Sequence, residues 1–330
     1  FIDPNPDPKL SYAERKRLFS LPSSTWKDYD PAFISKGGGV FEKTAKMISL
    51  SPEIQQLFNF NVAEITPNEL IKAILKLKVD LLWFGGIGTF IKSSKENHQD
   101  VGDRTNDNVR VNAKELRCKV IGEGANLGVT QLGRIEYANC GGRLNTDAID
   151  NSGGVNCSDH EVNIKILLNR MVLAGNLTLV DRNKLLESMT NDIAKLVLRD
   201  NYKQAQAISL LEAQGPNLLD GQIRIMRTLE AKGILNRTLE YLPDDATMLE
   251  YQTLQKGLTK PEIAILLAYS KIDFYQEILT SSLLDDFVFE EDLLNYFPEN
   301  MRKSYRAEIL VHPLRREIIA TKITNEIVNR

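Results

Sequence analysis

The stretch Lys119-Val-Ile-Gly-Glu-Gly-Ala-Asn-Leu-Gly128 decides the fold that we predict for this chain. It begins as a strand, Lys119–Ile121, and continues as a turn of small and polar residues. Eight of the twenty glycines lie between Gly122 and Gly154, and backbone without side-chain bulk can approach a flat ligand closely. Ligands of open α/β sheets bind beyond the carboxyl ends of the strands. We therefore predict a cofactor and substrate cleft after this strand.

A second apolar run precedes another glycine turn in Val79-Asp-Leu-Leu-Trp-Phe-Gly-Gly-Ile-Gly-Thr89. We predict that its strand, near Leu81–Phe84, is adjacent or nearly adjacent to the strand at Lys119–Ile121. Gly85 and Gly86 would let the backbone pass under the ribose or adenine of a nucleotide. The alternative is an ordinary strand-to-helix turn that requires glycine for steric reasons. The phosphate-binding pattern GxGxxG does not occur in this chain, so both interpretations stay open.

Glycine usage divides the chain near residue 155, because fifteen of the twenty glycines precede it. Before the divide, short apolar runs alternate with helical segments, and Thr66-Pro-Asn-Glu69 has the pattern of a capping box that starts one of them. This alternation predicts an α/β fold with a mainly parallel sheet. After residue 160, apolar residues recur at helical spacing, and Thr259-Lys-Pro-Glu262 repeats the capping pattern. We therefore predict two domains, residues 1–160 and an all-α C-terminal domain at residues 161–330.

Polar side chains accompany the turns of the predicted cleft. Asn126 can offer a donor and an acceptor to a carboxamide or a ribose. Glu123 could anchor this turn without touching the ligand itself. The small-residue segment Asp150-Asn-Ser-Gly-Gly-Val155 forms a further turn ahead of a helix that carries Ser158 near its start. Ser158 would hold a substrate carboxylate at that helix N-terminus. Alternatively it is only an N-cap whose capping box Glu161 closes, and the two interpretations can coexist.

The composition excludes several classes of partner. A net charge of −3 and an isoelectric point near 5.8 indicate no basic surface for nucleic acid or for an anionic membrane. No apolar run approaches the roughly 20 residues that span a bilayer, and there is no signal-peptide pattern. Three widely spaced cysteines fit a reducing compartment, so we expect a cytoplasmic protein. Cys157 and His160 provide too few ligands for zinc, and we predict no metal site.

Five segments together form a recognisable pattern: Asp80-Leu-Leu-Trp-Phe-Gly-Gly-Ile-Gly-Thr-Phe-Ile-Lys92, Asp100-Val-Gly-Asp-Arg-Thr-Asn-Asp107, Val120-Ile-Gly-Glu-Gly-Ala-Asn-Leu-Gly128, Gly133-Arg-Ile-Glu-Tyr137 and Asn145-Thr-Asp-Ala-Ile-Asp-Asn-Ser-Gly-Gly-Val155. These segments closely resemble the bacterial large NAD-specific glutamate dehydrogenases. The segments Phe1–Pro8, Leu198–Tyr202 and Leu242–Asp245 also look like that family. The resemblance therefore covers essentially the whole chain.

The resemblance implies oxidative deamination of L-glutamate to 2-oxoglutarate and ammonia, with hydride transfer to NAD. In this group of enzymes a Glu-Gly-Ala-Asn turn lies beside the nicotinamide end of the cofactor, which implies that role for Glu123 and Asn126. The turn that starts at Asn151 is similar to the stretch that closes the cofactor side of the cleft. Ser158 matches a serine that binds the side-chain carboxylate of the substrate.

Further along the same resemblance, Gly85 and Gly86 match the turn that passes under the adenosine part of NAD. The family's phosphate-binding glycine loop, ribose-reading acidic residue, catalytic lysines and catalytic aspartate all precede the point that matches Phe1. The family also continues past the point that matches Arg330. The resemblance thus implies that this chain is an internal part of the enzyme and contains no catalytic residue.

We therefore expect an α/β fold in which an incomplete Rossmann-type parallel sheet precedes the all-α C-terminal domain. A sheet without its first strands exposes an edge and apolar helix faces. Alone, the chain should aggregate or self-associate, bind NAD weakly or not at all, and form no NADH from glutamate. The expected partners are the upstream part of the same enzyme and further copies in a homo-oligomer of the intact enzyme. The alternative is a non-enzymatic remnant or interaction module from a broken reading frame.

Overall fold

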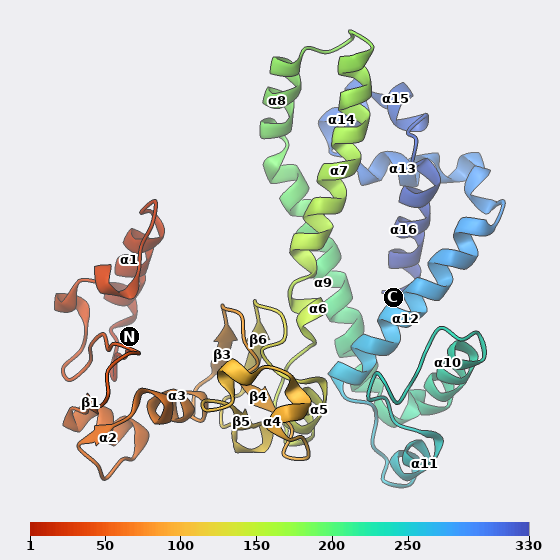
Figure 1. The fold of residues 1–330 in the computed structure, drawn as a ribbon. Coiled ribbons are helices and arrows are strands. Elements are labelled where there is room, and N and C mark those ends of the chain that lie inside the picture. Colours follow the sequence, from red (N-terminus) through yellow and green to blue (C-terminus); the bar gives the residue numbers. More distant parts are fainter. Residues whose placement is uncertain (330) are drawn as a thin grey trace.

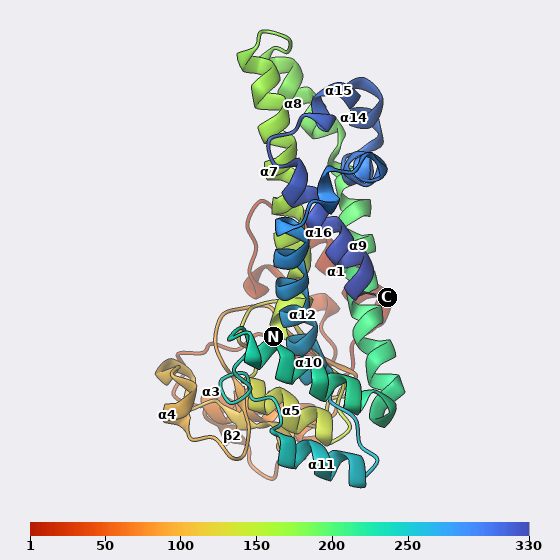
Figure 2. The same cartoon turned by 90° about the vertical axis from the view of Figure 1, so that its right-hand side faces the viewer.

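The structure is a computed structural model that describes residues 1–329, and three parts follow one another along the chain. In Figure 1 an N-terminal segment lies to the left, two small parallel sheets lie at the centre, and a helical part rises on the right. Figure 2 turns this view by 90° and shows α7 and α12 running upward through the helical part.

The N-terminal segment has a small core of its own, to which Ile54 and Leu70 contribute. Two short strands pair antiparallel in it, with Ile48 opposite Ile65. Its last helix begins with the predicted capping box at Thr66, which is confirmed. The elements are α1 (Pro8–Phe19), η1 (Trp26–Asp28), η2 (Pro31–Phe33), β1 (Ile48–Ser49), α2 (Pro52–Phe58), β2 (Glu64–Ile65) and α3 (Pro67–Leu75).

Two parallel strand pairs form the central α/β part. β3 (Leu81–Phe84) pairs with β6 (Val120–Glu123), which confirms the predicted adjacency of these strands. β4 (Ile91–Lys92) pairs in parallel with β5 (Val111–Asn112). The helices around them are α4 (His98–Val101), η3 (Arg104–Asn106), η4 (Ala113–Glu115) and α5 (Gln131–Asn139).

β3 is an edge strand of its sheet. Within the described residues it pairs only with β6, whereas β6 is also bridged on its other side by Arg143. Two apolar side chains of β3, Leu81 and Trp83, are 54% and 58% exposed. The parallel pairing agrees with the predicted α/β class, and the Rossmann-type topology stays a prediction.

From Asp147 onward the described chain is helical and contains no strand, which confirms the predicted change in character. The elements are α6 (Asp147–Asp150), α7 (Ser152–Leu173), α8 (Leu179–Ser188), α9 (Thr190–Gln214), η5 (Gly215–Leu218), α10 (Leu219–Ala231), α11 (Asp245–Thr253), α12 (Lys260–Thr280), η6 (Leu283–Asp285), η7 (Phe287–Phe289), α13 (Glu290–Tyr296), α14 (Glu299–Ser304), α15 (Arg306–Leu310) and α16 (Arg315–Val328).

Helix α12 connects the cores of the molecule. It contributes Ile278 to one buried cluster of the helical part and Leu267 to a second one. Its start also packs on α5 of the α/β part, where Gln131 Nε2 donates to Pro261 O at 3.3 Å. The capping box predicted at Thr259 is confirmed at this junction. The sheet and the helices are therefore joined through the beginning of α12.

Candidate functional site

The carboxyl ends of β3 and β6 bring the two glycine turns together. Because the strands are parallel neighbours, both turns leave the sheet at the same edge. The N–H of Ala125 donates to Phe84 O at 2.9 Å, which joins the turn after β6 directly to the end of β3. Gly85 and Gly86 therefore lie beside the turn Glu123–Asn126.

The indole of Trp83 occupies the space that two glycines of the β6 segment leave open. A Cβ atom on Gly122 or Gly124 would come closer than 3.0 Å to this ring, so a larger residue at either position would displace it. We expected these glycines to admit a flat ligand, and the flat group that lies against them belongs to the chain itself. The outer side of Trp83 is exposed, and a Cβ on Gly86 would meet open space. A ligand would therefore meet Trp83 and Gly86 first.

Glu123 faces the protein interior, and none of its surface is exposed. Its carboxylate accepts two hydrogen bonds from Arg134 on α5, at 2.7 Å from Nε and 2.8 Å from Nη2. Burial raises the pKa of Glu123, and the Arg134 ion pair opposes that rise. A bidentate pair fixes the relative position of the two elements that carry it. This geometry supports the anchoring role that the sequence suggested for Glu123, and its contact with a cofactor stays a prediction.

Helix α6 is tied to the same turn by two carboxylates. Asp147 Oδ2 accepts the N–H of Leu127, and Asp150 Oδ2 accepts the N–H of Glu123, both at 2.8 Å. Arg134 Nη2 also lies 3.1 Å from Asp147 Oδ1. The desolvation of Asp150 raises its pKa. Arg134 and the two aspartates thus hold the turn from both sides.

Sequence reasoning did not assign a role to Arg134, Asp147 or Asp150. Arg134 precedes the buried Tyr137 by three residues, so both lie on one face of α5. A cation on the buried face of a helix needs a carboxylate partner, and that rule could have marked Arg134 as a network residue. No spacing in the sequence identifies Asp147 as one of its partners.

The two asparagines of the prediction both lie at this turn. Asn151 Nδ2 donates to Glu123 O at 2.7 Å and to Asp147 O at 2.9 Å. Asn126 is exposed at the tip of the turn. The structure therefore brings together five residues that the sequence singled out, and we call them the turn cluster: Gly85, Gly86, Glu123, Asn126 and Asn151.

Ser158 lies outside the turn cluster, and its predicted place at a helix N-terminus is wrong. α7 begins at Ser152, so Ser158 is in the second turn of the helix and cannot cap it. We had interpreted Gly153 as part of a turn, but it is helical. Packing of α7 against α9 overrides the low helix propensity of glycine here.

Ser158 nevertheless shares one face of α7 with Asn151. Seven residues correspond to two helical turns, or about 10 Å along the axis. Val155 and Val162 lie on the same face and are 74% and 54% exposed. An exposed apolar strip therefore runs from the turn cluster to Ser158, and a ligand bound at the turns would follow it to reach that hydroxyl.

No group of three histidine, cysteine, aspartate or glutamate side chains in residues 1–329 is arranged to hold a metal ion. No helix in that range is long and apolar enough to cross a membrane. The three cysteines are free, Cys118 being buried and Cys140 and Cys157 exposed.

Comparison with known proteins gives two family matches. Residues 1–211 match the family model of the bacterial NAD-glutamate dehydrogenase catalytic domain. Residues 255–330 match the model of the glutamate dehydrogenase C-terminal region. The first match covers well over half of the chain.

Three curated relatives are similar to the whole chain, and each is named NAD-specific glutamate dehydrogenase. The chain is 50% identical to the protein of Pseudomonas aeruginosa over 329 residues and 46% identical to that of Halomonas elongata over 329 residues. It is 48% identical to that of Mycobacterium tuberculosis over 335 aligned positions. The alignments cover 100% of this chain but only 20%, 20% and 21% of the relatives. The chain thus spans about one fifth of the length of these proteins.

Proposed function

Because the chain belongs to the bacterial NAD-glutamate dehydrogenase family, we propose that it forms part of an NAD-dependent glutamate dehydrogenase, an oxidoreductase. The reaction is the oxidative deamination of L-glutamate to 2-oxoglutarate and ammonia, with hydride transfer to NAD. The observation that carries the proposal is the 46–50% identity over the full chain to relatives of that name. Since the chain spans one fifth of these relatives, the activity is a property of a longer polypeptide.

NAD binds at the turn cluster in this proposal. Gly85 and Gly86 pass under the adenosine, because a Cβ at Gly86 would meet open space and the backbone there is accessible. Asn126 reaches the nicotinamide end from the exposed tip of the turn. The dinucleotide-binding part comprises residues 1–160, and residues 161–330 form the helical domain. The parallel pairing of β3 with β6 supports this arrangement, because cofactors of such sheets bind at the carboxyl ends of strands.

Ser158 binds the side-chain carboxylate of glutamate. The strip along α7 supports this role, because it leads from Asn151 in the turn cluster to Ser158 over about 10 Å. Its exposed valines, Val155 and Val162, give the aliphatic part of a bound molecule an apolar surface. Ser158 thus acts through its hydroxyl and not through the N-terminus of a helix.

The acid–base groups of the reaction come from outside this chain. Glu123, Asp147 and Asp150 are the carboxylates at the turn cluster, and each already accepts hydrogen bonds from the turn or from Arg134. A general acid or base must instead reach the reacting atoms of the substrate. We therefore expect the isolated chain to form no NADH from glutamate.

The free edge of β3 takes a further strand of the same polypeptide. Edge strands with exposed apolar side chains are usually covered, and Leu81 and Trp83 are more than half exposed. Relatives five times longer than the chain have ample sequence for such strands. This docking also brings the missing catalytic groups to the turn cluster.

The test measures glutamate-dependent NADH formation. The wild-type and variant sequences of residues 1–330 are each placed in a polypeptide that carries the segments present in the longer relatives. Asn126→Ala should raise the KM for NAD about tenfold, because the hydrogen bonds of its amide with the cofactor are lost. Ser158→Ala should raise the KM for glutamate about tenfold and leave the KM for NAD unchanged. Cys157→Ala is the matched control, because Cys157 is the exposed neighbour of Ser158 on α7.

Two outcomes would contradict the proposal. If the full-length wild-type protein reduces NAD with another amino acid but not with glutamate, the substrate is wrong. If Ser158→Ala and Cys157→Ala behave alike while glutamate is turned over, the activity stands and the assignment of Ser158 fails.

A further inference from the structure

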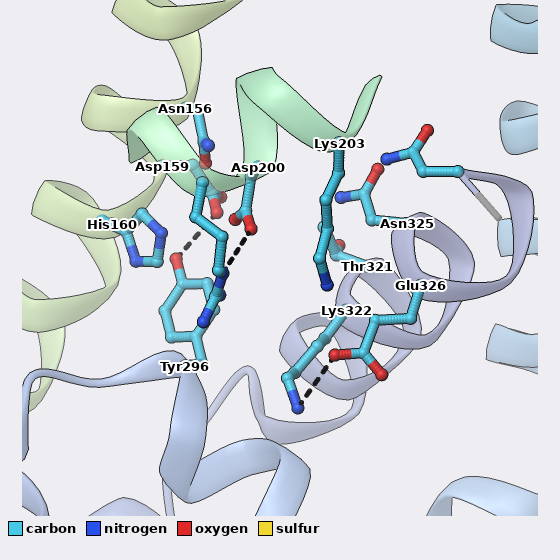
Figure 3. A pocket seen from close by; sticks show the side chains of 12 residues that line it. Asn156, Asp159, His160, Asp200, Lys203, Tyr296, Thr321, Lys322, Asn325 and Glu326 are labelled. Atoms are coloured by element: carbon cyan, nitrogen blue, oxygen red, sulfur yellow. Dashed lines mark hydrogen bonds and ion pairs between the residues drawn. The ribbon is translucent and has the colours of Figure 1, made fainter. Parts of the chain in front are cut away.

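A polar cavity of about 40 Å³ lies in the helical part, between α7, α9, α13 and α16. In Figure 3, His160 and Tyr296 line one side of it, and Lys203 and Lys322 extend into it from the other. This volume holds a few water molecules or one carboxylate or phosphate group, because a single water occupies about 10–15 Å³ of such space. A nucleotide does not fit.

The cavity is separate from the proposed glutamate site. Successive residues of a helix are turned by about 100°, so His160 points away from the side of α7 that carries Ser158, and Asp159 lies between the two sides. Lys203 and Lys322 line the cavity from α9 and α16, helices that carry neither a residue of the turn cluster nor Ser158. A ligand in this cavity would therefore be a second ligand of the protein.

The wall formed by α7 and α13 is fixed by side-chain hydrogen bonds. Tyr296 donates its hydroxyl hydrogen to Asp159 Oδ2 at 2.7 Å and accepts a hydrogen bond from Asn163 Nδ2 at 2.8 Å. The ring of His160 stacks on that of Tyr296, with 4.3 Å between their centroids. His312 Nε2 lies 3.0 Å from Asn163 O and holds the same wall from behind. The cavity is thus a defined space and not a gap between mobile side chains.

The carboxylates that line the cavity already have partners. Asp159 accepts the Tyr296 hydroxyl. Asp200 accepts Arg199 Nε at 3.1 Å. Glu326 lies 3.5 Å from the Nζ atom of Lys322. A bound cation would have to compete with these contacts.

Several donors of the lining have no partner, beside one buried acceptor that also lacks one, Asn329 Oδ1. Lys203 Nζ has no hydrogen bond or ion pair within residues 1–329, and Arg199 uses only its Nε atom there. His160 is 2% exposed, and its Nδ1 atom is buried without a hydrogen-bond partner in the described chain. An unpaired polar atom inside a protein is costly unless something binds it.

We propose that this cavity binds one oxyanion, the carboxylate or phosphate group of a small metabolite, through Lys203, Arg199 and His160. The Nδ1–H tautomer of His160 donates to the anion, and Lys203 and the two terminal nitrogens of Arg199 supply the charge. Lys322 borders the site on α16, with its Nζ atom hydrogen-bonded to Asp292. Because the ligands come from α7, α9 and α16, a bound anion ties these three helices together.

The test titrates the purified protein with inorganic phosphate and, separately, with acetate at constant ionic strength, and measures the heat of binding. Chloride replaces the anion in the blank, so general screening is subtracted. We expect saturable binding of at least one of the two anions. Lys203→Gln should weaken it about tenfold, because a hydrogen bond to a charged group is lost. Lys195→Gln is the matched control, because it removes the same charge from the same helix α9. Lys195 pairs with Asp192 and does not line the cavity.

A second variant tests the buried nitrogen. His160→Phe keeps an aromatic ring against Tyr296 and removes Nδ1, so it should weaken binding several-fold with the helical content unchanged by circular dichroism. Phosphate binding without acetate binding identifies a phosphoryl ligand, and the reverse identifies a carboxylate. The proposal is overturned if neither anion binds saturably, if ammonium binds in their place, or if Lys203→Gln and Lys195→Gln bind alike.

Discussion

Glu123 in the α/β part and Glu262 at the start of α12 are both buried, with 0% and 2% of their surface exposed. Their partners differ. Glu123 receives two hydrogen bonds from the guanidinium of Arg134. Glu262 receives the N–H of Thr259 at 2.7 Å and its hydroxyl at 2.5 Å, and Lys256 acts on it only through its charge.

The difference shows two ways of tolerating a buried carboxylate. An ion pair keeps the charge and depends on it, so removing either partner leaves an uncompensated ion in the interior. A cap needs only an acceptor oxygen, so the charge of Glu262 contributes little and burial raises its pKa. The α/β part therefore relies on charge at the turn cluster, and the junction with the helical part relies on hydrogen bonds.

The largest effect is expected from Arg134→Met. It leaves Glu123 buried without its counter-charge, so the free energy of unfolding of the α/β part should fall by about 3–5 kcal/mol. Urea denaturation followed by the fluorescence of Trp83 measures it, in a Trp26→Phe background that removes the other tryptophan.

Lys119→Met is the control for this prediction. Lys119 pairs with Asp80 at the start of the same two strands, but both side chains are mostly exposed, so its loss should leave the denaturation curve unchanged. The double variant Glu123→Gln with Arg134→Met should recover part of the loss, because no unpaired charge is left inside. Equal curves for Arg134→Met and the wild type would show that the pair is not needed.

The second prediction compares the stability contributed by the two capping boxes. Thr66→Ala removes a partly exposed N-cap and should cost about 1 kcal/mol. Thr259→Ala removes the hydroxyl that donates to the buried Glu262 carboxylate and should cost about 1–3 kcal/mol. Thermal unfolding of the two variants side by side measures the difference. A larger loss for Thr66→Ala would contradict the idea that burial strengthens the dependence on the cap.

The capping boxes also show how far the sequence determines the structure. Thr-x-x-Glu spacing is local, so it predicted the starts of α3 and α12 correctly. It could not predict that one box is exposed and the other buried. The burial of Thr259 arises because α12 begins against α5, where Gln131 meets Pro261, and those residues are 130 positions apart in the sequence.

The candidate site was likewise predictable in part from the sequence. The pairing of β3 with β6 was predictable, because two apolar runs separated by helical segments favour parallel neighbours. The sequence suggested an anchoring role for Glu123 but not its partner Arg134, because the network depends on how α5 and α6 pack on the turn. Ser158 was misplaced because Gly153 and Gly154 favoured a turn, and only the packing of α7 on α9 makes them helical.

The oxyanion cavity joins residues from Asn156 to Asn329, a set that no local pattern connects.

The smallest effect is expected from Glu262→Gln, and its sign depends on pH. The amide oxygen of glutamine can accept the same two hydrogen bonds from Thr259, but it carries no charge to desolvate. Burial raises the pKa of Glu262 in the folded protein above that of the unfolded chain. The wild-type residue therefore contributes most to the free energy of unfolding below the unfolded pKa, near 4.5. This contribution to stability is lost as the pH rises through the folded pKa.

Glutamine at position 262 should thus match the wild type near pH 4 and exceed it near pH 8 by on the order of 1 kcal/mol. Urea denaturation at both pH values measures the difference between the variant and the wild type, which removes the contribution of all other titrating groups. The same substitution at the other buried carboxylate, Glu123→Gln, should destabilise at pH 8, because Arg134 then loses its charged partner. If both variants change stability with the same sign at pH 8, the two carboxylates do not differ in their need for charge, since the ion pair and the cap would then respond alike to its removal.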